Sequence, residues 1–259
     1  MTDRTLHLVT RGPIAELVLN RPDKRNALSA AMWRAIPMLV GEAAADPAVR
    51  VLILRGASVE AFSAGADIAE FEEVHASAAS ARAYHESVAA AYDVVARLGK
   101  PTIAMVQGVC FGGGCALALC CDVRYADPSA RFCIPPARLG LTYSLGETKR
   151  LVDLVGPSRA KEMLMGARVI EAEEALRIGL ATRLFAAADL ERETLAFAGQ
   201  LAGLSQFTIR AVKQVVDEIQ NGAVAETELS RRLLDEQFEG PDYLEGRRAF
   251  LEKRPARFT

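Results

Sequence analysis

The alternation of apolar and polar positions divides the chain into two parts. In the first part, four short apolar runs, at 6–12, 14–20, 50–56 and 102–108, are bounded by glycine, proline or polar loops, a pattern that predicts β-strands. A Gly-Pro pair separates the first two runs and predicts a hairpin. Stretches with helical periodicity lie between the later runs, so we expect strand–helix–strand units with parallel pairing.

The helical stretches can be placed from their start and stop signals. Ser29 is positioned to cap the helix that follows it, and Pro37 should kink that helix. The alanine-rich segment 67–98 has a helical pattern, and the second half of the chain is almost entirely helical in pattern. We therefore predict an α/β fold, with a core domain over residues 1–200 and a helical region over residues 201–259.

Composition narrows the class of protein. The chain has 259 residues, of which 51% are hydrophobic, enough for a substantial core. Its 31 basic and 33 acidic residues give a net charge of −2, which argues against nucleic-acid binding because that needs a basic excess. No apolar run approaches the roughly 18 residues of a membrane span, and the N-terminus has no apolar signal-peptide core. We expect a soluble cytoplasmic protein with no nucleic-acid or membrane partner.

Cysteine and histidine are the residue types most often used for metal sites. The five cysteines lie mostly inside apolar runs, at Cys110, Cys115, Cys120, Cys121 and Cys133. No histidine lies near them, so we expect no metal and interpret them as small buried residues in a reducing compartment. His7, His75 and His85 belong to no recognisable motif, and we interpret His85 as a surface or packing residue.

Two stretches of small residues stand where a buried strand gives way to a helical pattern. They read FSAGAD at 62–67 and FGGGCA at 111–116. A helix N-terminus leaves backbone N–H groups unpaired and carries partial positive charge, so two such stretches together could form an oxyanion hole. Close packing of helix on strand is an alternative reason for the glycines. A dinucleotide-binding loop is a poor match, because the glycine spacing and the following acidic residue are missing.

At this point the chain resembles the crotonase (enoyl-CoA hydratase/isomerase) superfamily over essentially its whole length. The resemblance is carried by motifs in the family's order: LNRPDKRNALS, FSAGADIAEF, VQGVCFGGGCALALCCDVRYAD, RLGL, EAEEALRIGL and EGRRAFLEKRPARF. It implies a ClpP-like spiral of β-β-α units with a helical C-terminal trimerisation region. It also implies an acyl-CoA thioester as the substrate, with coenzyme A as part of that substrate and no separate cofactor.

The resemblance assigns roles to residues of the two small-residue stretches. The backbone amides of Ala66 and Gly113 match the family's oxyanion donors and would bind the thioester oxygen as it becomes enolate-like. The stretch that contains Ala64, Asp67 and Ile68 would border the adenine of coenzyme A.

Further residues match family positions near coenzyme A. Lys24 and Arg25 match the loop that approaches the phosphates, although a solvated basic turn would look the same. Phe250 and Lys253 match C-terminal residues that reach the coenzyme A site of a neighbouring subunit, although they could equally belong to an ordinary amphipathic helix. The resemblance implies a homotrimer or a dimer of trimers.

The chain departs from the hydratases at both catalytic glutamates. The residue that follows the glycines is Ala116, and the residue at the second position is Pro136. Neither side chain can carry a proton, whereas each general acid or base typically contributes 10²–10⁴-fold to a rate. Ordinary hydratase catalysis and the isomerase chemistry that uses the second glutamate are therefore in doubt.

Two nearby residues are candidates for moving a proton instead. Tyr143 lies in an LGxxYxL pattern similar to that of methylmalonyl-CoA decarboxylases of the same superfamily, and a phenol can donate a hydrogen bond without ionising. Glu147 could project into the pocket. The alternatives are that Tyr143 shapes the pocket with its hydroxyl bonded to the backbone, and that Glu147 complements a helix dipole. We interpret Asp67 as a helix cap rather than a base.

Three hypotheses for function follow. The first is an enzyme of the enoyl-CoA hydratase/isomerase family that stabilises a thioester enolate. The second is an acyl-CoA decarboxylase of the methylmalonyl-CoA type that uses Tyr143. The third is a member that binds acyl-CoA without catalysis or serves as a structural subunit.

Overall fold

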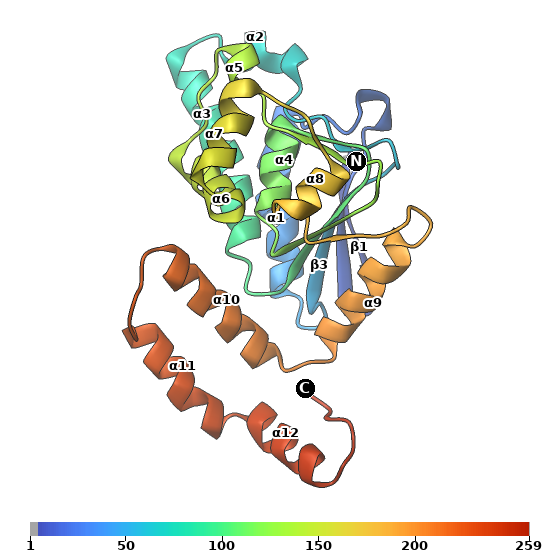
Figure 1. Ribbon diagram of the computed structural model, residues 1–259, viewed down its shortest axis with the longest axis vertical. Coiled ribbons are helices and arrows are strands. Elements are labelled where there is room, and N and C mark those ends of the chain that lie inside the picture. Colours follow the sequence, from blue (N-terminus) through green and yellow to red (C-terminus); the bar gives the residue numbers. More distant parts are fainter. Residues whose placement is uncertain (1–4, 259) are drawn as a thin grey trace.

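Two β-sheets form the centre of the molecule (Figure 1). The computed structural model describes residues 5–258. The large sheet has the strand order β1 (Leu6–Arg11), β2 (Ile14–Leu19), β3 (Val51–Gly56), β5 (Thr102–Val106), β7 (Val123–Ala126) and β10 (Arg183–Leu184). The small sheet has the order β4 (Ala61–Ser63), β6 (Val109–Phe111), β8 (Arg131–Cys133) and β9 (Ile170–Glu171).

The large sheet confirms the predicted hairpin and the predicted parallel pairing. β1 and β2 are antiparallel, with partners from Leu6 opposite Leu19 to Arg11 opposite Ile14. From β2 onward all neighbours are parallel. Both faces of the central strands are covered, which explains their unbroken apolar sequences.

The small sheet turns the chain into the expected spiral. β3, β5 and β7 of the large sheet are each followed by a strand of the small sheet, namely β4, β6 and β8, and these strands pair in the same order. The β-β-α unit is therefore confirmed. The predicted strand–helix–strand units lack these small-sheet strands. A strand of three residues is too short to show a period of two, so the sequence pattern did not predict them.

Helices surround the two sheets and extend beyond them (Figure 1). Their bounds are α1 (Ala30–Ala45), α2 (Phe71–Val74), α3 (Ala78–Ala96), α4 (Gly112–Leu119), α5 (Pro136–Leu139), α6 (Leu145–Val155), α7 (Pro157–Gly166), α8 (Ala172–Arg177), α9 (Leu190–Ala202), α10 (Gln206–Gln220), α11 (Glu228–Glu239) and α12 (Pro241–Leu251), with 3-10 turns at η1 (Pro22–Lys24) and η2 (Ile68–Glu70). Within residues 5–258, no helix is long and apolar enough to cross a membrane.

Two of the predicted helices show which helix boundaries the start and stop signals predict and which they do not. The Ser29 side chain accepts a hydrogen bond from the Met32 amide (3.2 Å) and so caps α1, which continues through Pro37 to Ala45. The segment predicted as one helix over 67–98 is divided into η2, α2 and α3. Ser77 breaks it, because its side chain caps α3 in a reciprocal capping box.

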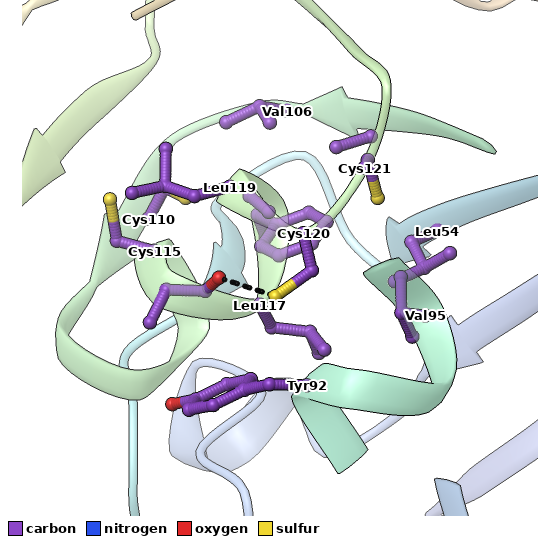
Figure 2. Packing of buried hydrophobic residues seen from close by; sticks show 14 of the residues in the cluster. Leu54, Tyr92, Val95, Val106, Cys110, Cys115, Leu117, Leu119, Cys120 and Cys121 are labelled. Atoms are coloured by element: carbon purple, nitrogen blue, oxygen red, sulfur yellow. Dashed lines mark hydrogen bonds between the residues drawn. The ribbon is translucent and has the colours of Figure 1, made fainter. Parts of the chain in front are cut away.

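The core lies on both faces of the large sheet. Leu52 and Leu54 of β3 belong to the larger apolar cluster, whereas Val51 and Ile53 of the same strand pack with residues of α9. The larger cluster contains four of the five cysteines, and all five are buried and free, as expected. Cys120 donates its thiol hydrogen to the Ala116 carbonyl at 3.2 Å (Figure 2). Burial raises the pKa of Cys120 to about 12, so this thiol stays protonated.

The last three helices form an arm that extends away from the sheets (Figure 1). Neither α10 nor α11 buries a residue, and α12 buries only Ala249. The predicted boundary after residue 200 falls close to the end of α9. The division into two domains stays a prediction.

Candidate functional site

The two small-residue stretches lie against each other. Gly65 has φ +98°, a conformation that favours glycine. A Cβ atom on Gly65 would lie 2.9 Å from the Phe111 carbonyl oxygen and 3.3 Å from the Gly113 nitrogen. No side chain fits there, so Gly65 is the residue that lets the loop after β4 contact the start of α4.

The three consecutive glycines have different surroundings. Gly112 has φ +50°, and a Cβ there would lie 3.8 Å from the Tyr143 hydroxyl oxygen. A Cβ on Gly114 would lie 2.5 Å from the Cβ of Ser63, which makes Gly114 a residue of close helix–strand packing. Close packing of helix on strand therefore accounts for Gly114, and the oxyanion interpretation of the run stays a prediction.

Gly113 is held from the side by two aromatic residues. A Cβ on Gly113 would lie 3.0 Å from Cζ2 of Trp33 and 3.1 Å from the hydroxyl oxygen of Tyr92. The Tyr92 hydroxyl donates a hydrogen bond to the Gly113 carbonyl (3.2 Å). Trp33 and Tyr92 contact each other edge to face, with ring centroids 5.4 Å apart. Their packing fixes the orientation of the Gly113 peptide.

The backbone amides of Ala66 and Gly113 are unpaired donors. No described residue accepts a hydrogen bond from either, and Gly113 stands in the first turn of α4, where helical partners are lacking. Ala66 is held in place by its neighbours, since the Leu28 amide donates to the Gly65 carbonyl (2.7 Å) and the Asp67 amide donates to the Leu28 carbonyl (2.9 Å). Two fixed donors of this kind can bind a ligand oxygen that carries negative charge.

A cavity of about 540 Å³ lies beside these amides, and Ala66, Gly113, Tyr143 and Glu147 all line it. The structure thus brings together the four residues that the sequence nominated for chemistry. A second cavity, of about 420 Å³, lies between α10 and the core, and none of these four residues lines it.

Tyr143 presents an unpaired hydroxyl group. No described residue forms a hydrogen bond with it, and its ring packs against the larger apolar cluster. The alternative that Tyr143 only shapes the pocket stays open. Burial raises the pKa of Tyr143 above its ordinary value near 10, and the charge of Glu147 raises it further. The phenol is therefore protonated and able to donate.

Glu147 closes the N-terminus of α6. Its Oε2 accepts hydrogen bonds from the Ser144 amide (2.9 Å) and the Ser144 hydroxyl (2.6 Å), and the Ser144 hydroxyl accepts from the Glu147 amide (3.3 Å). This capping box confirms that the carboxylate stands in the first turn of a helix. Oε1 forms no hydrogen bond with a described residue and is left for a ligand or water.

The residues predicted to border coenzyme A form a second group beside the cavity, outside its wall. The Ala64 amide donates to the Arg25 carbonyl (2.9 Å), so the turn with Lys24 and Arg25 lies next to the loop that runs from Ala64 to Ile68. Lys24, Arg25 and Ile68 are exposed. Their contact with coenzyme A stays a prediction.

Asp67 is a cap, as predicted, and it also forms an ion pair. Its side chain accepts a hydrogen bond from the Ala69 amide (3.2 Å) and one from the Arg21 guanidinium (2.8 Å). Burial by itself would raise the pKa of Asp67, but the Arg21 and Ala69 hydrogen bonds outweigh it and lower the pKa overall. Asp67 is thus a fixed carboxylate that holds the loop after β4.

Phe250 and Lys253 are not brought to the cavity within one chain. Phe250 is 83% exposed on α12, and α12 lies at the opposite end of the molecule from α2 and α5 (Figure 1). A role for these residues at the site of a neighbouring subunit stays a prediction.

The sequence analysis missed a group of residues on the cavity wall. Phe71, His75, Tyr84 and His85 come from α2, the turn after it, and α3, and all line the cavity. His85 is exposed, as interpreted, but it also lies on this wall. The break in the helical pattern at Ser77 folds α2 back on α3, and periodicity alone gave no signal of that turn. Within residues 5–258, no group of three or more His, Cys, Asp or Glu residues could hold a metal ion.

The fold and the site together identify the family of this protein. They combine a two-sheet spiral, two unpaired amides on one cavity wall and a helical arm. The chain belongs to the enoyl-CoA hydratase/isomerase family, whose sequence model matches residues 10–259. Among sequence relatives, the chain is 38% identical to a crotonyl-CoA hydratase of Syntrophomonas wolfei over 251 residues, which cover 95% of this chain and 94% of the relative.

Other similar proteins agree with this assignment. A short-chain-enoyl-CoA hydratase of Clostridium acetobutylicum is 33% identical over 252 residues, which cover 95% of this chain and 94% of the relative. A crystal structure of an enoyl-CoA hydratase/isomerase family protein from Hyphomonas neptunium superposes with a TM-score of 0.95 at 42% identity, covering 98% of this chain and 97% of the other.

Proposed function

We propose that the protein binds an acyl-CoA thioester and stabilises its enolate with the amides of Ala66 and Gly113. One observation carries the proposal: two unpaired backbone amides, held by Gly65 and by Tyr92, line the same cavity. When Cα gains carbanion character, negative charge moves to the thioester oxygen. A fixed donor at that position is typically worth about 2.7–4 kcal/mol of transition-state stabilisation.

The relatives' names favour hydration as the reaction, and Glu147 is the residue that supports it here. Hydration adds the oxygen of water to Cβ and a proton to Cα. The catalytic positions of the hydratases hold Ala116 and Pro136, which are buried and lie outside the cavity wall. Glu147 lines the cavity with a free Oε1, so its carboxylate can orient a water molecule, accept its proton as the hydroxyl adds to Cβ, and return a proton to Cα.

Decarboxylation is the second candidate, and Tyr143 is the observation that favours it. In that reaction the bond between Cα and the carboxylate carbon breaks, CO₂ leaves, and the electron pair forms an enolate held by the two amides. A proton then returns to Cα. The protonated and unpaired hydroxyl of Tyr143, on the same cavity wall as Gly113, is suited to donate it.

A panel of substrates separates these reactions. The substrates are crotonyl-CoA, a longer 2-enoyl-CoA, a 3-enoyl-CoA and methylmalonyl-CoA, each tested with wild type, Glu147→Gln and Tyr143→Phe. We expect hydration of a 2-enoyl-CoA that falls by 10²–10⁴-fold in Glu147→Gln. CO₂ release that is lost in Tyr143→Phe would replace hydration by decarboxylation. Binding of all four esters without turnover would favour a non-catalytic acyl-CoA binder.

We also propose that the protein is a homotrimer, or a dimer of trimers, assembled through its C-terminal arm. The arm supports this because it leaves large apolar side chains in water, among them Ile219, Phe238, Leu244 and Phe250. Such an assembly would let Phe250 and Lys253 reach the coenzyme A of a neighbouring chain. Light scattering should give three or six times the mass of one chain.

A further inference from the structure

The N-terminus of α1 has only half of a local cap. The Ser29 side chain accepts a hydrogen bond from the Met32 amide. A complete capping box would also have glutamate or glutamine at position 32, where this chain has methionine. The first turn of α1 contains no acidic residue. The helix therefore lacks a carboxylate of its own to complement the partial positive charge at its N-terminus.

Glu70 supplies that carboxylate from a distant part of the chain. Its Oε2 atom accepts a hydrogen bond from the Ala30 amide at 2.6 Å, across 40 residues of sequence. A hydrogen bond to an ionised acceptor is roughly twice as strong as one between neutral groups. Ala30 is the first residue of α1, and Glu70 ends η2 in the loop after β4. The bond therefore joins the loop that carries Ala66 to the start of α1.

The same loop is joined to the chain just before α1 by a second set of bonds. The Leu28 amide donates to the Gly65 carbonyl, and the Asp67 amide donates to the Leu28 carbonyl. Leu28 and Ala66 form an isolated parallel bridge between these bonds. The Leu28 bonds thus fix the backbone on either side of Ala66, and the Glu70 bond fixes the loop three residues further on.

The α1 helix in turn contacts the residue that carries the second amide. Trp33 is the fourth residue of α1, and its Cζ2 atom would lie 3.0 Å from a Cβ atom on Gly113. The loop also contacts α4 directly, because a Cβ on Gly65 would lie 3.3 Å from the Gly113 nitrogen. The loop, α1 and α4 therefore form a triangle of contacts, and the Glu70 bond belongs to the side between the loop and α1.

We propose that Glu70 is a positioning residue of the oxyanion hole, which sets the spacing between the Ala66 and Gly113 amides by holding the loop after β4 to α1. Glu70 does not line the cavity, so it acts through the two amides and not on the substrate. A misplacement of about 1 Å at a reacting centre can lower a rate about 10²-fold. The inference rests on the proposed function, because it requires the thioester oxygen to be bound by these amides.

Exchange of the Cα hydrogens of butyryl-CoA in D₂O tests the inference, because this saturated ester cannot be hydrated. The rate at saturating ester reports on the oxyanion hole, and calorimetric titration gives the Kd. We expect Glu70→Ala to lower the saturated rate by about 10–10²-fold and to change the Kd by less than about threefold. Glu70→Gln should keep a rate within about fivefold of the wild type, because its amide oxygen can still accept the Ala30 hydrogen.

Two further variants separate positioning from stability. Glu72 is exposed on α2 and outside the cavity wall, so Glu72→Ala is the matched control and should exchange like the wild type. Ala31→Asp, added to Glu70→Ala, places a carboxylate at an exposed site in the first turn of α1. This double variant should regain part of the stability lost in Glu70→Ala, measured by urea unfolding, but keep the slow exchange. Where Glu70→Ala alone does not fold, the double variant takes its place.

Two results would overturn the inference and leave the proposed function intact. One is a folded Glu70→Ala that exchanges at the wild-type rate. The other is a double variant whose exchange rate recovers together with its stability, because Glu70 would then act only as a helix cap. A wild type that binds butyryl-CoA without exchange would instead contradict the proposed function, and the inference would fail with it.

Discussion

Tyr143 and Glu147 reach the cavity from one short segment, just before and just after the start of α6. Tyr143 contributes an unpaired hydroxyl, whereas Glu147 divides its carboxylate between a capping box and the cavity. Glu147 therefore contributes both to the stability of the fold and to the cavity. The change in stability that follows its substitution can be measured apart from the change in rate.

The raised pKa of Tyr143 leads to a prediction for the pH dependence of the rate. Burial raises this pKa above 10, so the phenol is neutral at any lower pH. A Tyr143-dependent rate should therefore not fall between about pH 7 and pH 9. A pH–rate profile of wild type against Tyr143→Phe checks this. A loss of the Tyr143-dependent rate with a midpoint below pH 9 would contradict the account.

The lowered pKa of Asp67 leads to a prediction for the pH dependence of stability. Its pKa is lowered in the folded state, so its contribution is present above the ordinary value of about 3.9 and is lost as the pH falls toward the folded value. Asp67→Asn should cost about 1 kcal/mol at pH 7, because the hydrogen bond to Arg21 loses its charge assistance in a largely buried position.

Urea unfolding at about pH 7 and pH 3 measures this difference. The difference between wild type and Asp67→Asn should be smaller at the lower pH. A difference that is constant or grows on acidification would show that the pKa of Asp67 is not lowered by folding.

At the scale of elements, the contact between the loop after β4 and the start of α4 positions both amides. Gly65→Ala should place a Cβ against the Phe111 carbonyl in a backbone conformation with φ +98°. We expect a loss of at least about 2 kcal/mol in stability and a loss of activity. Gly41→Ala, in an open position of α1, is the control and should stabilise by roughly 0.5–1 kcal/mol. A Gly65→Ala enzyme as stable and active as wild type would contradict this account of the contact.

The elements also show what could be predicted from the sequence. Four strands of the large sheet (β1, β2, β3 and β5), the Ser29 cap and the glycine-led α4 follow from local patterns, and each was found. The strands β4, β6 and β8 have three residues each, too few for a period to be recognised. Their place is set by pairing with residues far along the chain.

The candidate site could likewise be predicted only where its signal is local in the sequence. Ala66 and Gly113 stand beside glycines at helix starts, a signal that is local in sequence. His75 and Tyr84 reach the cavity because α2 turns back on α3. Their place on the cavity wall depends on contacts that form only after folding, and their spacing in the sequence does not predict it.

At the scale of the whole molecule, the arm of α10, α11 and α12 makes a prediction about assembly. Phe238 is 59% exposed on α11, so Phe238→Asp should weaken the proposed trimer without removing a core contact. Val224→Asp is the control, because Val224 is fully exposed in the loop after α10. Light scattering as a function of concentration measures the mass of each variant. A wild type that stays monomeric, or a Phe238→Asp variant with unchanged assembly, would contradict the proposal.

The central claim is that Ala66 and Gly113 stabilise a thioester enolate, and exchange of the Cα hydrogens of a bound acyl-CoA in D₂O tests it most directly. Ala66→Pro removes one donor because proline has no N–H, and Ala66→Gly retains it. We expect the wild type and Ala66→Gly to incorporate deuterium at Cα, and a folded Ala66→Pro to do so about 10²–10³-fold more slowly. An acyl-CoA that binds to the wild type without exchange would contradict the claim and leave a protein that binds the thioester but does not activate it.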